Sequence, residues 1–211
     1  MSRTSSALIL VDIQPDFMPG GNLPVEDGRA IVQPIQTLLE DDPFDLYVAT
    51  QDWHPADHVS FASNHPGRKP MDTIELYGHE QVLWPDHCVQ GTPGAELHPE
   101  LPWHQIAVII RKGADPKSDS YSGFRNNWNP DGERPPTGLA GYLRERGVEA
   151  LTLCGLARDI CVKWTAEDAA REGFAVRYAW DLTRAVDPSK DNAVREDLVR
   201  AGVDVIDAKD L

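Results

Sequence analysis

The sequence has no run of about 18 consecutive apolar residues, roughly the shortest stretch that crosses a bilayer as a helix. Residues 1–6 lead straight into a strand-like run and lack the pattern of a signal peptide. Cysteine is also scarce, and three thiols, an odd number, favour free cysteines in a reducing compartment over a disulfide framework. These absences predict a cytoplasmic protein with no membrane partner.

Positive charge is the next shortage. The chain carries 20 Lys and Arg against 34 Asp and Glu, for a net charge of −14. Such a field repels phosphate backbones, so we expect no nucleic-acid partner, whereas a small neutral substrate would be indifferent to it. Adaptation to salt and simple solubility are two further readings of the acidity. A homo-oligomer is compatible with the sequence.

The pattern of apolar residues predicts one α/β domain over residues 1–211, since this length and 41% hydrophobic content are ordinary for a single globular unit. Strand-like runs lie at 6–12, 44–50, 106–111, 150–154, 175–180 and 203–206, and helical patterns at 27–40, 137–146, 157–172 and 188–201. Pro34 is expected to kink the first helix. The alternation predicts a three-layer α/β/α sandwich with a mainly parallel sheet.

A long segment at about 52–103 interrupts this alternation with His, Pro, Gly and aromatic residues, and long loops in compact domains are usually functional. It begins with Asp52 and His54, which sit two apart after a strand and therefore project to the same side. A carboxylate, an imidazole and a third candidate, His87, suit a metal ion. An isolated D-x-H is common by chance, and His58 is either a ligand, a neighbour of the site or a surface residue.

Three further reactive residues fall at strand ends. Asp12 ends the first strand, Lys112 follows the third, and Cys161 lies near the start of the helix after the fourth. Ligands of open parallel sheets bind at this edge. A helix start and a nearby cation lower the pKa of a thiol, so we expect a Cys161 thiolate near neutral pH, with Asp12 moving the proton. The set suggests an amidase for a small molecule; the alternatives are a buried apolar Cys161, a capping Asp12 and a surface Lys112.

Ordered blocks of residues then support a resemblance that covers residues 8 to about 187. The blocks are Leu8–Leu23, Thr50–Pro55 with His58–Ala62, Trp84–Thr92 continuing to Leu97–Pro99, Lys112–Gly113, Asp119–Phe124 and Gly155–Lys163. Together they resemble the nicotinamidase/pyrazinamidase family of the isochorismatase-like hydrolases. The family resemblance implies the isochorismatase-like hydrolase fold and hydrolysis of nicotinamide to nicotinate and ammonia through a cysteine thioester, a step of NAD salvage. It extends the expected activity to pyrazinamide.

The resemblance also implies the roles of individual residues. They are the catalytic triad Asp12, Lys112 and Cys161; the metal ligands Asp52, His54 and His87; and the pocket residues Phe17, Leu23, Trp84 and Tyr121. The cofactor is one divalent ion, with Zn²⁺ preferred over Fe²⁺ or Mn²⁺. An isochorismatase-type hydrolase or another amide hydrolase of the superfamily is the first alternative, and a non-catalytic metal-stabilised scaffold is the second.

The segment around the nucleophile carries both an expectation and two departures. The resemblance implies a cis peptide between Leu156 and Ala157, and an oxyanion hole formed by the backbone N–H groups of Ala157 and Cys161. Relatives commonly have Thr and an aromatic residue or His where this chain has Arg158 and Ile160. Because both positions flank the pocket, substrate preference is where we expect this chain to differ.

Overall fold

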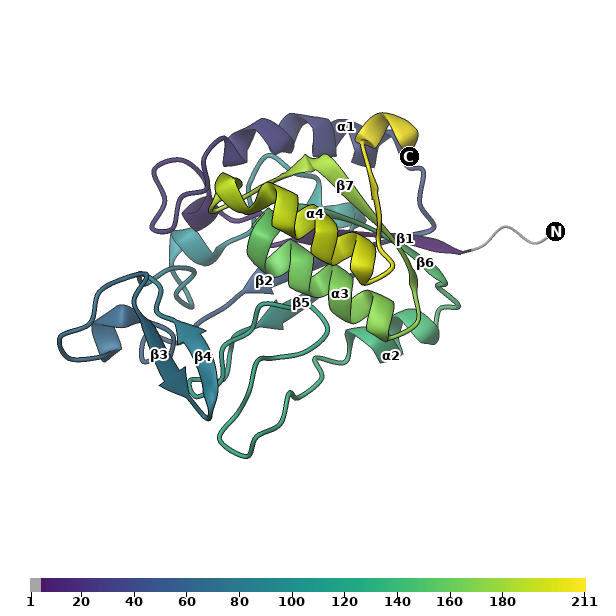
Figure 1. Cartoon of the computed structure of the whole chain (residues 1–211). Coiled ribbons are helices and arrows are strands. Elements are labelled where there is room, and N and C mark those ends of the chain that lie inside the picture. Colours follow the sequence, from purple (N-terminus) through teal and green to yellow (C-terminus); the bar gives the residue numbers. More distant parts are fainter. Residues whose placement is uncertain (1–4) are drawn as a thin grey trace.

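A computed structural model describes residues 5–211 and contains a six-stranded sheet in the order β5-β2-β1-β6-β7-β8 (Figure 1). Its strands are β1 (Ser6–Val11), β2 (Leu46–Asp52), β5 (Val108–Lys112), β6 (Ala150–Leu156), β7 (Ala175–Arg184) and β8 (Asp204–Ile206). All adjacent pairs in this sheet are parallel. A separate antiparallel hairpin joins β3 (Thr73–Leu76) and β4 (His79–Val82).

Helices cover both faces of the sheet, as the alternating pattern predicts. The α-helices are α1 (Val32–Asp41), α2 (Leu139–Arg144), α3 (Lys163–Arg171) and α4 (Asp191–Arg200), with a π-helical turn at Arg158–Val162 before α3. Short 3-10 helices lie at Pro15–Phe17, Gly28–Ile31, Ala62–Asn64, Pro93–Ala95, Trp103–Gln105, Pro188–Lys190 and Ala208–Asp210. None of the helices described here is long and apolar enough to cross a membrane.

Two apolar cores explain the layers. Along β1, Ile9 packs into a core shared with α2, α3 and α4, whereas Leu8 and Leu10 pack into a second core shared with α1. Successive side chains of a strand point to opposite faces, and a strand covered on both faces therefore reads as a continuous apolar run. The three-layer α/β/α prediction is confirmed.

Several expected boundaries differ from the structure. The helix expected at 27–40 begins as a 3-10 turn and becomes α1 only at Val32. Pro34 lies in the first turn of α1, where a missing N–H leaves no intrahelical bond unmade, so it is no obstacle to the helix. Lys112 is the last residue of β5 rather than the residue after it. The β3–β4 hairpin was not predicted, because its residues lack a clear apolar alternation.

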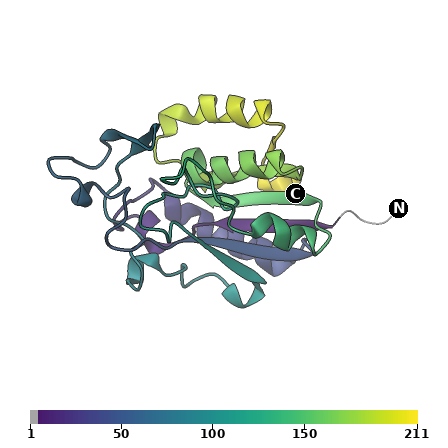
Figure 2. The ribbon, with the colours of Figure 1, turned by 90° about the horizontal axis from the view of Figure 1, so that it is seen from below.

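The segment from 52 to 103 lies beyond the carboxyl ends of the strands. In both views the β3–β4 region occupies the end of the molecule opposite the start of β1 (Figures 1 and 2). Parallel strands place all their carboxyl ends on one edge. The insertion therefore covers the edge at which the candidate residues were expected.

Candidate active site

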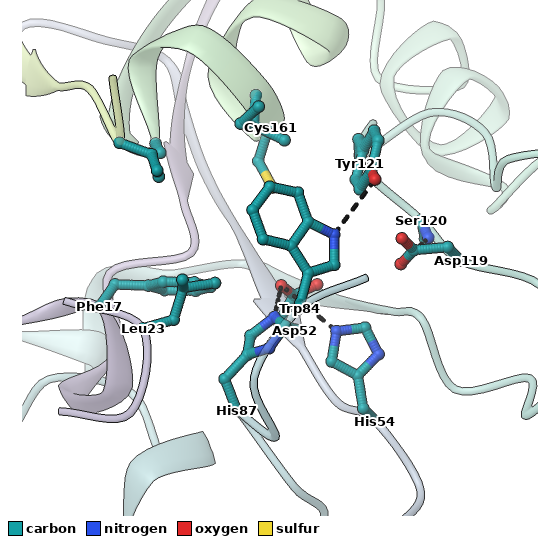
Figure 3. A pocket seen from close by; sticks show the side chains of 13 residues that line it. Phe17, Leu23, Asp52, His54, Trp84, His87, Asp119, Ser120, Tyr121 and Cys161 are labelled. Atoms are coloured by element: carbon teal, nitrogen blue, oxygen red, sulfur yellow. Dashed lines mark hydrogen bonds and ion pairs between the residues drawn. The ribbon is translucent and has the colours of Figure 1, made fainter. Parts of the chain in front are cut away.

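A small pocket opens at this edge and holds about 350 Å³ of space when its mouth is included. Its lining residues are Phe17, Leu23, Asp52, His54, Trp84, His87, Asp119, Ser120, Tyr121, Ala157, Ile160, Cys161 and Val186 (Figure 3). All four expected pocket residues and all three expected metal ligands are among them. The structure therefore brings together side chains from segments more than 140 residues apart in the sequence.

The three expected catalytic residues form a buried cluster behind the pocket wall. Lys112 Nζ lies 2.9 Å from Asp12 Oδ2 and 3.4 Å from Cys161 Sγ, and it also hydrogen-bonds to Asp52. The order β5-β2-β1-β6 explains the cluster, because Lys112, Asp52 and Asp12 end or follow three adjacent strands and Cys161 follows the fourth. Thr50 Oγ1 donates to Asp12 Oδ1 at 2.6 Å and orients the carboxylate.

Burial sets the protonation of this cluster. Burial alone would lower the pKa of Lys112, but the carboxylates of Asp12 and Asp52 raise it well above its usual range, so the ammonium stays charged. Burial raises the pKa of the Cys161 thiol well above its usual range; Lys112 lowers it, but the two carboxylates raise it further. The direction of this shift runs against the expectation of a Cys161 thiolate near neutral pH. Cys161 is only 6% exposed, and the rise in the pKa of its thiol on desolvation is larger than the lowering by the helix start and Lys112.

Asp12 has the properties of the proton acceptor that such a thiol needs. Burial raises the pKa of its carboxyl, although Lys112 opposes the shift. A raised pKa improves a carboxylate as a general base at neutral pH. One carboxylate oxygen of Asp12 lies within 4.8 Å of Cys161 Sγ. The thiol proton therefore has a nearby acceptor at the moment of attack.

The expected metal ligands converge beside this cluster. The Nε2 atoms of His54 and His87 lie 3.5 and 3.8 Å from Asp52 Oδ2, and all three side chains are buried. The Nδ1 atoms face the carbonyl oxygens of Gly113 and Pro85 at 3.0 and 2.7 Å. Carbonyls only accept, so in the neutral rings both Nδ1 atoms carry the proton and both Nε2 atoms present lone pairs toward Asp52.

Three acceptor atoms that face one another need a positive charge between them. Burial lowers the pKa of His54, but Asp52 outweighs it and raises that pKa above its usual value. The cluster thus attracts either a proton or a cation. One carboxylate and two imidazoles are also the donor set that zinc and similar divalent ions accept, so these residues fit a divalent metal.

His58 lies next to this set without pointing into it. Its ring centroid is 4.3 Å from that of His54, but its Nδ1 accepts from the backbone N–H of Ser60, and its Nε2 faces the carbonyl of Ser118 at 3.3 Å. Burial lowers the pKa of His58 to about 4, so the ring is neutral. His58 also forms a second group of possible ligands with His54 and Asp119, whose donor atoms lie within 4.8 Å of one another, so its position fits a ligand as well as a neighbour.

One charged residue of the pocket, Asp119, was not predicted from the sequence. Asp119 lines the pocket, and its carboxylate accepts from Gln81 Nε2 at 2.7 Å and from the backbone N–H of Ser120 at 2.8 Å. The same Gln81 amide donates to the hydroxyl of Tyr121 at 3.1 Å. Asp119 stood in a block that supported the family resemblance, where only Tyr121 was assigned a role. Gln81, on the unpredicted β4, gave no signal in the sequence.

The segment around the nucleophile agrees with one expectation and refines another. The peptide between Leu156 and Ala157 is cis, as the resemblance implies. Ile160 lines the pocket, but the Arg158 side chain hydrogen-bonds to Thr183 on β7, and Arg158 is absent from the lining. Of the two departures from the family pattern, only Ile160 lines the pocket.

Comparison with known proteins agrees with this geometry. The family model for the isochorismatase domain matches residues 6–210. A nicotinamidase from Acinetobacter baylyi is 49% identical over 181 residues, covering 86% of this chain and 82% of that relative. The structure of an Acinetobacter baumanii nicotinamidase/pyrazinamidase superposes with a TM-score of 0.91 at 43% identity, covering 100% of this chain and 99% of that one.

A structure with lower sequence identity was solved with a bound metal ion. A pyrazinamidase from Pyrococcus horikoshii, solved in complex with zinc, superposes with a TM-score of 0.77 at 35% identity over 96% of this chain and 99% of that one. Each of these similarities extends over most of both chains, and the fold and the family resemblance read from the sequence are both confirmed. The chain belongs to the nicotinamidase/pyrazinamidase family of the isochorismatase-like hydrolases.

Proposed function

We propose that this chain hydrolyses nicotinamide to nicotinate and ammonia, with Cys161 as nucleophile and Asp12 and Lys112 as its catalytic partners. One observation carries the proposal: a buried thiol faces a small pocket, with an ammonium and a carboxylate behind it and a metal-binding set beside it. The nicotinamidase relatives support the substrate. The Acinetobacter baumanii structure supports pyrazinamide as a second one.

The charge of the pocket supports a neutral substrate. In the described part of the chain, its lining contains the carboxylates of Asp52 and Asp119 but no lysine or arginine. Burial of an anionic substrate there would be costly without a cationic partner. A neutral aromatic carboxamide suits it better, because Phe17, Trp84 and Tyr121 supply ring surfaces at its walls. A dicarboxylate substrate of the isochorismatase type would add two negative charges beside these carboxylates, with one divalent ion on Asp52, His54 and His87 to offset them, and is thereby disfavoured.

The reaction follows from the positions of the triad. Cys161 Sγ attacks the carboxamide carbon while Asp12 accepts the thiol proton, and Lys112 stabilises the negative charge that passes between sulfur and carboxylate. The C–N bond breaks as Asp12 returns the proton to nitrogen, which leaves as ammonia. Water then attacks the thioester, Asp12 accepts its proton, and that proton finally returns to the released Cys161 sulfur.

The carbonyl oxygen needs donors when it becomes negative. We assign this role to the backbone N–H groups of Ala157 and Cys161, because both residues line the pocket at the start of the nucleophile-bearing helix. Oxyanion donors of this kind contribute about 3–4 kcal/mol each to transition-state stabilisation.

Asp52, His54 and His87 would hold one divalent ion, and zinc is the candidate that the Pyrococcus horikoshii relative supports. When bound, the ion supplies a Lewis-acidic partner for the ring nitrogen of the substrate. The protein itself contributes the fixed orientation of the ligands. Gln14 accepts the backbone N–H of Asp52 at 2.8 Å and donates to its carbonyl at 2.9 Å, which anchors the end of β2.

The decisive experiment measures ammonia released from nicotinamide by the purified protein, before and after treatment with a chelator. Release should require intact Cys161 and should fall when the metal is removed and recover on addition of Zn²⁺. Benzamide, which lacks the ring nitrogen, serves as the matched poor substrate. No ammonia from the metal-loaded protein would exclude the proposed activity.

A further inference from the structure

Arg158 stands where relatives commonly have threonine, and in the structure its side chain is buried against β7. It begins the π-helical turn that also carries Ile160 and Cys161, yet its own side chain is directed at β7. The residue is only 7% exposed. A guanidinium buried to this extent needs partners for its donors.

Those partners come from an irregularity in the sheet. Leu153 pairs with Tyr178, but the next pair is Gly155 with Thr183, so that Cys154 alone faces residues 179–182 of β7. Extra residues in one strand leave backbone groups without a ladder partner. Arg158 supplies donors there: it hydrogen-bonds to the carbonyls of Thr183 at 2.8 Å and Trp180 at 3.3 Å, and to Thr183 Oγ1 at 3.0 Å.

The guanidinium also fastens the next element. Its Nη1 donates to Asp191 Oδ2 at 2.6 Å, at the first residue of α4, and its Cζ lies 4.1 Å from the ring centroid of Trp180. The neighbouring Asp159 carboxylate accepts the backbone N–H groups of Val186 and Asp187 at 2.8 and 2.9 Å. Two consecutive residues of the π-turn therefore hold the segment 183–187 at both of its ends.

This segment matters because Val186 lines the pocket. Its backbone N–H is held by Asp159, and its side chain packs against the second core. We propose that Arg158 is a positioning residue that fixes the bulged end of β7, and thereby places Val186 as the wall that limits the size of ring substituents. The inference rests on the proposed function in one respect, that a ring carboxamide occupies the pocket. Without Arg158, the Trp180 carbonyl keeps its bond from Thr183 Oγ1 and the Thr183 carbonyl keeps its bond from Arg184. The bonds that tie this end of β7 to the π-turn are lost, however, and the side chain of Asp159 remains as the link between the π-turn and residues 186–187.

The test compares nicotinamide with 5-methylnicotinamide in Arg158→Met and in the matched control Arg195→Met. Arg195 also lies over the Trp180 ring, at 3.7 Å, but it is exposed and reaches neither Thr183 nor the π-turn in any contact of the described chain. The readout is the ratio of the two kcat/KM values. That ratio is independent of how much of the preparation is correctly folded.

In Arg158→Met the methylated substrate should gain on nicotinamide by about tenfold, the discrimination that one methyl group provides in an apolar pocket. Arg195→Met should leave the ratio unchanged. Arg158→Lys keeps a donor for the Thr183 carbonyl but loses the planar guanidinium that also reaches Asp191. Its ratio should therefore lie between those of the wild type and Arg158→Met. Val186→Ala opens the wall directly and should raise the ratio, with a less than additive effect when combined with Arg158→Met.

A second readout does not depend on any substrate. Hydrogen exchange at the amides of Val186 and Asp187 should accelerate in Arg158→Met and not in Arg195→Met, because opening of the segment 183–187 exposes both N–H groups. Unchanged exchange in Arg158→Met would overturn the positioning role, as would an unchanged substrate ratio in either Arg158→Met or Val186→Ala. Wild-type protein that releases no ammonia from nicotinamide would instead reject the proposed function, and the exchange data would still decide the role of Arg158.

Discussion

The proposed catalytic triad and the proposed metal ligands, here called the metal set, lie side by side but are built from different parts of the chain. The triad residues end or follow strands of the central sheet, whereas both histidines proposed as metal ligands come from the insertion at 52–103. The two groups also differ in charge. Lys112 contacts both Asp12 and Asp52 and compensates them from within, while the metal set consists of acceptor atoms that face one another.

This difference separates what each cluster needs. In the triad, the positive charge of Lys112 offsets the negative charge of Asp12. The geometry of the triad therefore depends on the sheet, which aligns the strand ends that carry these residues. In the metal set Lys112 contacts Oδ1 of Asp52, but Asp52 Oδ2 and the Nε2 atoms of His54 and His87 face one another and need a cation or a proton between them. Because Asp52 contributes to both, changes in one cluster should be distinguishable from changes in the other by metal content, rate and Michaelis constant.

The largest effect is expected from removal of the nucleophile. Cys161→Ala should lower kcat by on the order of 10⁴- to 10⁶-fold, because no other group can form the thioester. Metal content and thermal stability should stay close to wild type, since the metal set does not use the thiol. The matched controls are Cys88→Ala and Cys154→Ala, two buried cysteines that should cost stability alone. Activity of Cys161→Ala within tenfold of wild type would remove covalent catalysis from the mechanism.

Removal of the shared cation should damage both rate and stability. Lys112→Met leaves Asp12 and Asp52 buried without their counter-charge, a loss of about 3–5 kcal/mol in the free energy of unfolding. Turnover should fall by on the order of 10²- to 10³-fold, as when one preorganised donor is lost. Lys112→Arg keeps the charge in a different shape and should recover only part of each. Chemical denaturation and steady-state kinetics measure the two effects, and a fully stable Lys112→Met would contradict the compensation described above.

The same variant tests the pKa of the nucleophile. Lys112 lowers the pKa of the Cys161 thiol, while burial and the two carboxylates raise it. Loss of the lysine should therefore move the onset of iodoacetamide labelling of Cys161 to higher pH. The measurement uses a background without Cys88 and Cys154, the other two thiols of the chain. A labelling profile that does not move would mean that Lys112 leaves the thiol untuned.

Damage to the metal set should appear in binding rather than in the chemical step. Loss of an outer partner of a ligating histidine already weakens metal binding by about 10–100-fold, so His54→Ala should lose most of its metal. We expect KM for nicotinamide to rise more than kcat falls, because the ring nitrogen loses its partner while the triad remains. Metal analysis and kinetics on the same sample provide the comparison. Efficient hydrolysis of benzamide by the wild type would contradict ring anchoring.

The smallest effect is expected from Gln81, which does not line the pocket but hydrogen-bonds to two residues that do. Gln81→Leu removes the donor to Asp119 Oδ2 and to the Tyr121 hydroxyl. A hydrogen bond to a charged group contributes about 1.5–3 kcal/mol, so kcat/KM should fall by about tenfold, with metal content unchanged. Gln81→Glu is the comparison variant, because it places a second carboxylate beside Asp119. Its kcat/KM should be lower than that of Gln81→Leu. Equal activity in both variants would show that Asp119 is held by other contacts.

Much of the catalytic edge follows from local patterns in the sequence. Apolar runs identified the strands of the central sheet, and three of them ended next to Asp12, Asp52 and Lys112, so the rule for parallel sheets placed these residues on one edge. The two-residue spacing of Asp52 and His54 predicted that they face the same side, and they do. His87 was a third candidate ligand because it lies in the long segment after Asp52 and His54, and the family resemblance then implied its role. The pocket residues and the cis peptide came from the resemblance alone, because nothing in local spacing indicates them.

The sequence by itself therefore determined the order of layers, the edge of the site and the identity of its reactive residues, since these depend on periodicity and on motifs of a few residues. Only the tertiary structure decided their electrostatics. Whether the Cys161 thiol ionises depends on how completely water is excluded and on two carboxylates contributed by other strands. The contact of Gln81 with Asp119, across 38 residues, and the direction of Arg158 toward β7 also arise only when distant segments pack. Desolvation and long-range contacts are properties of the folded assembly, and no local spacing encodes them.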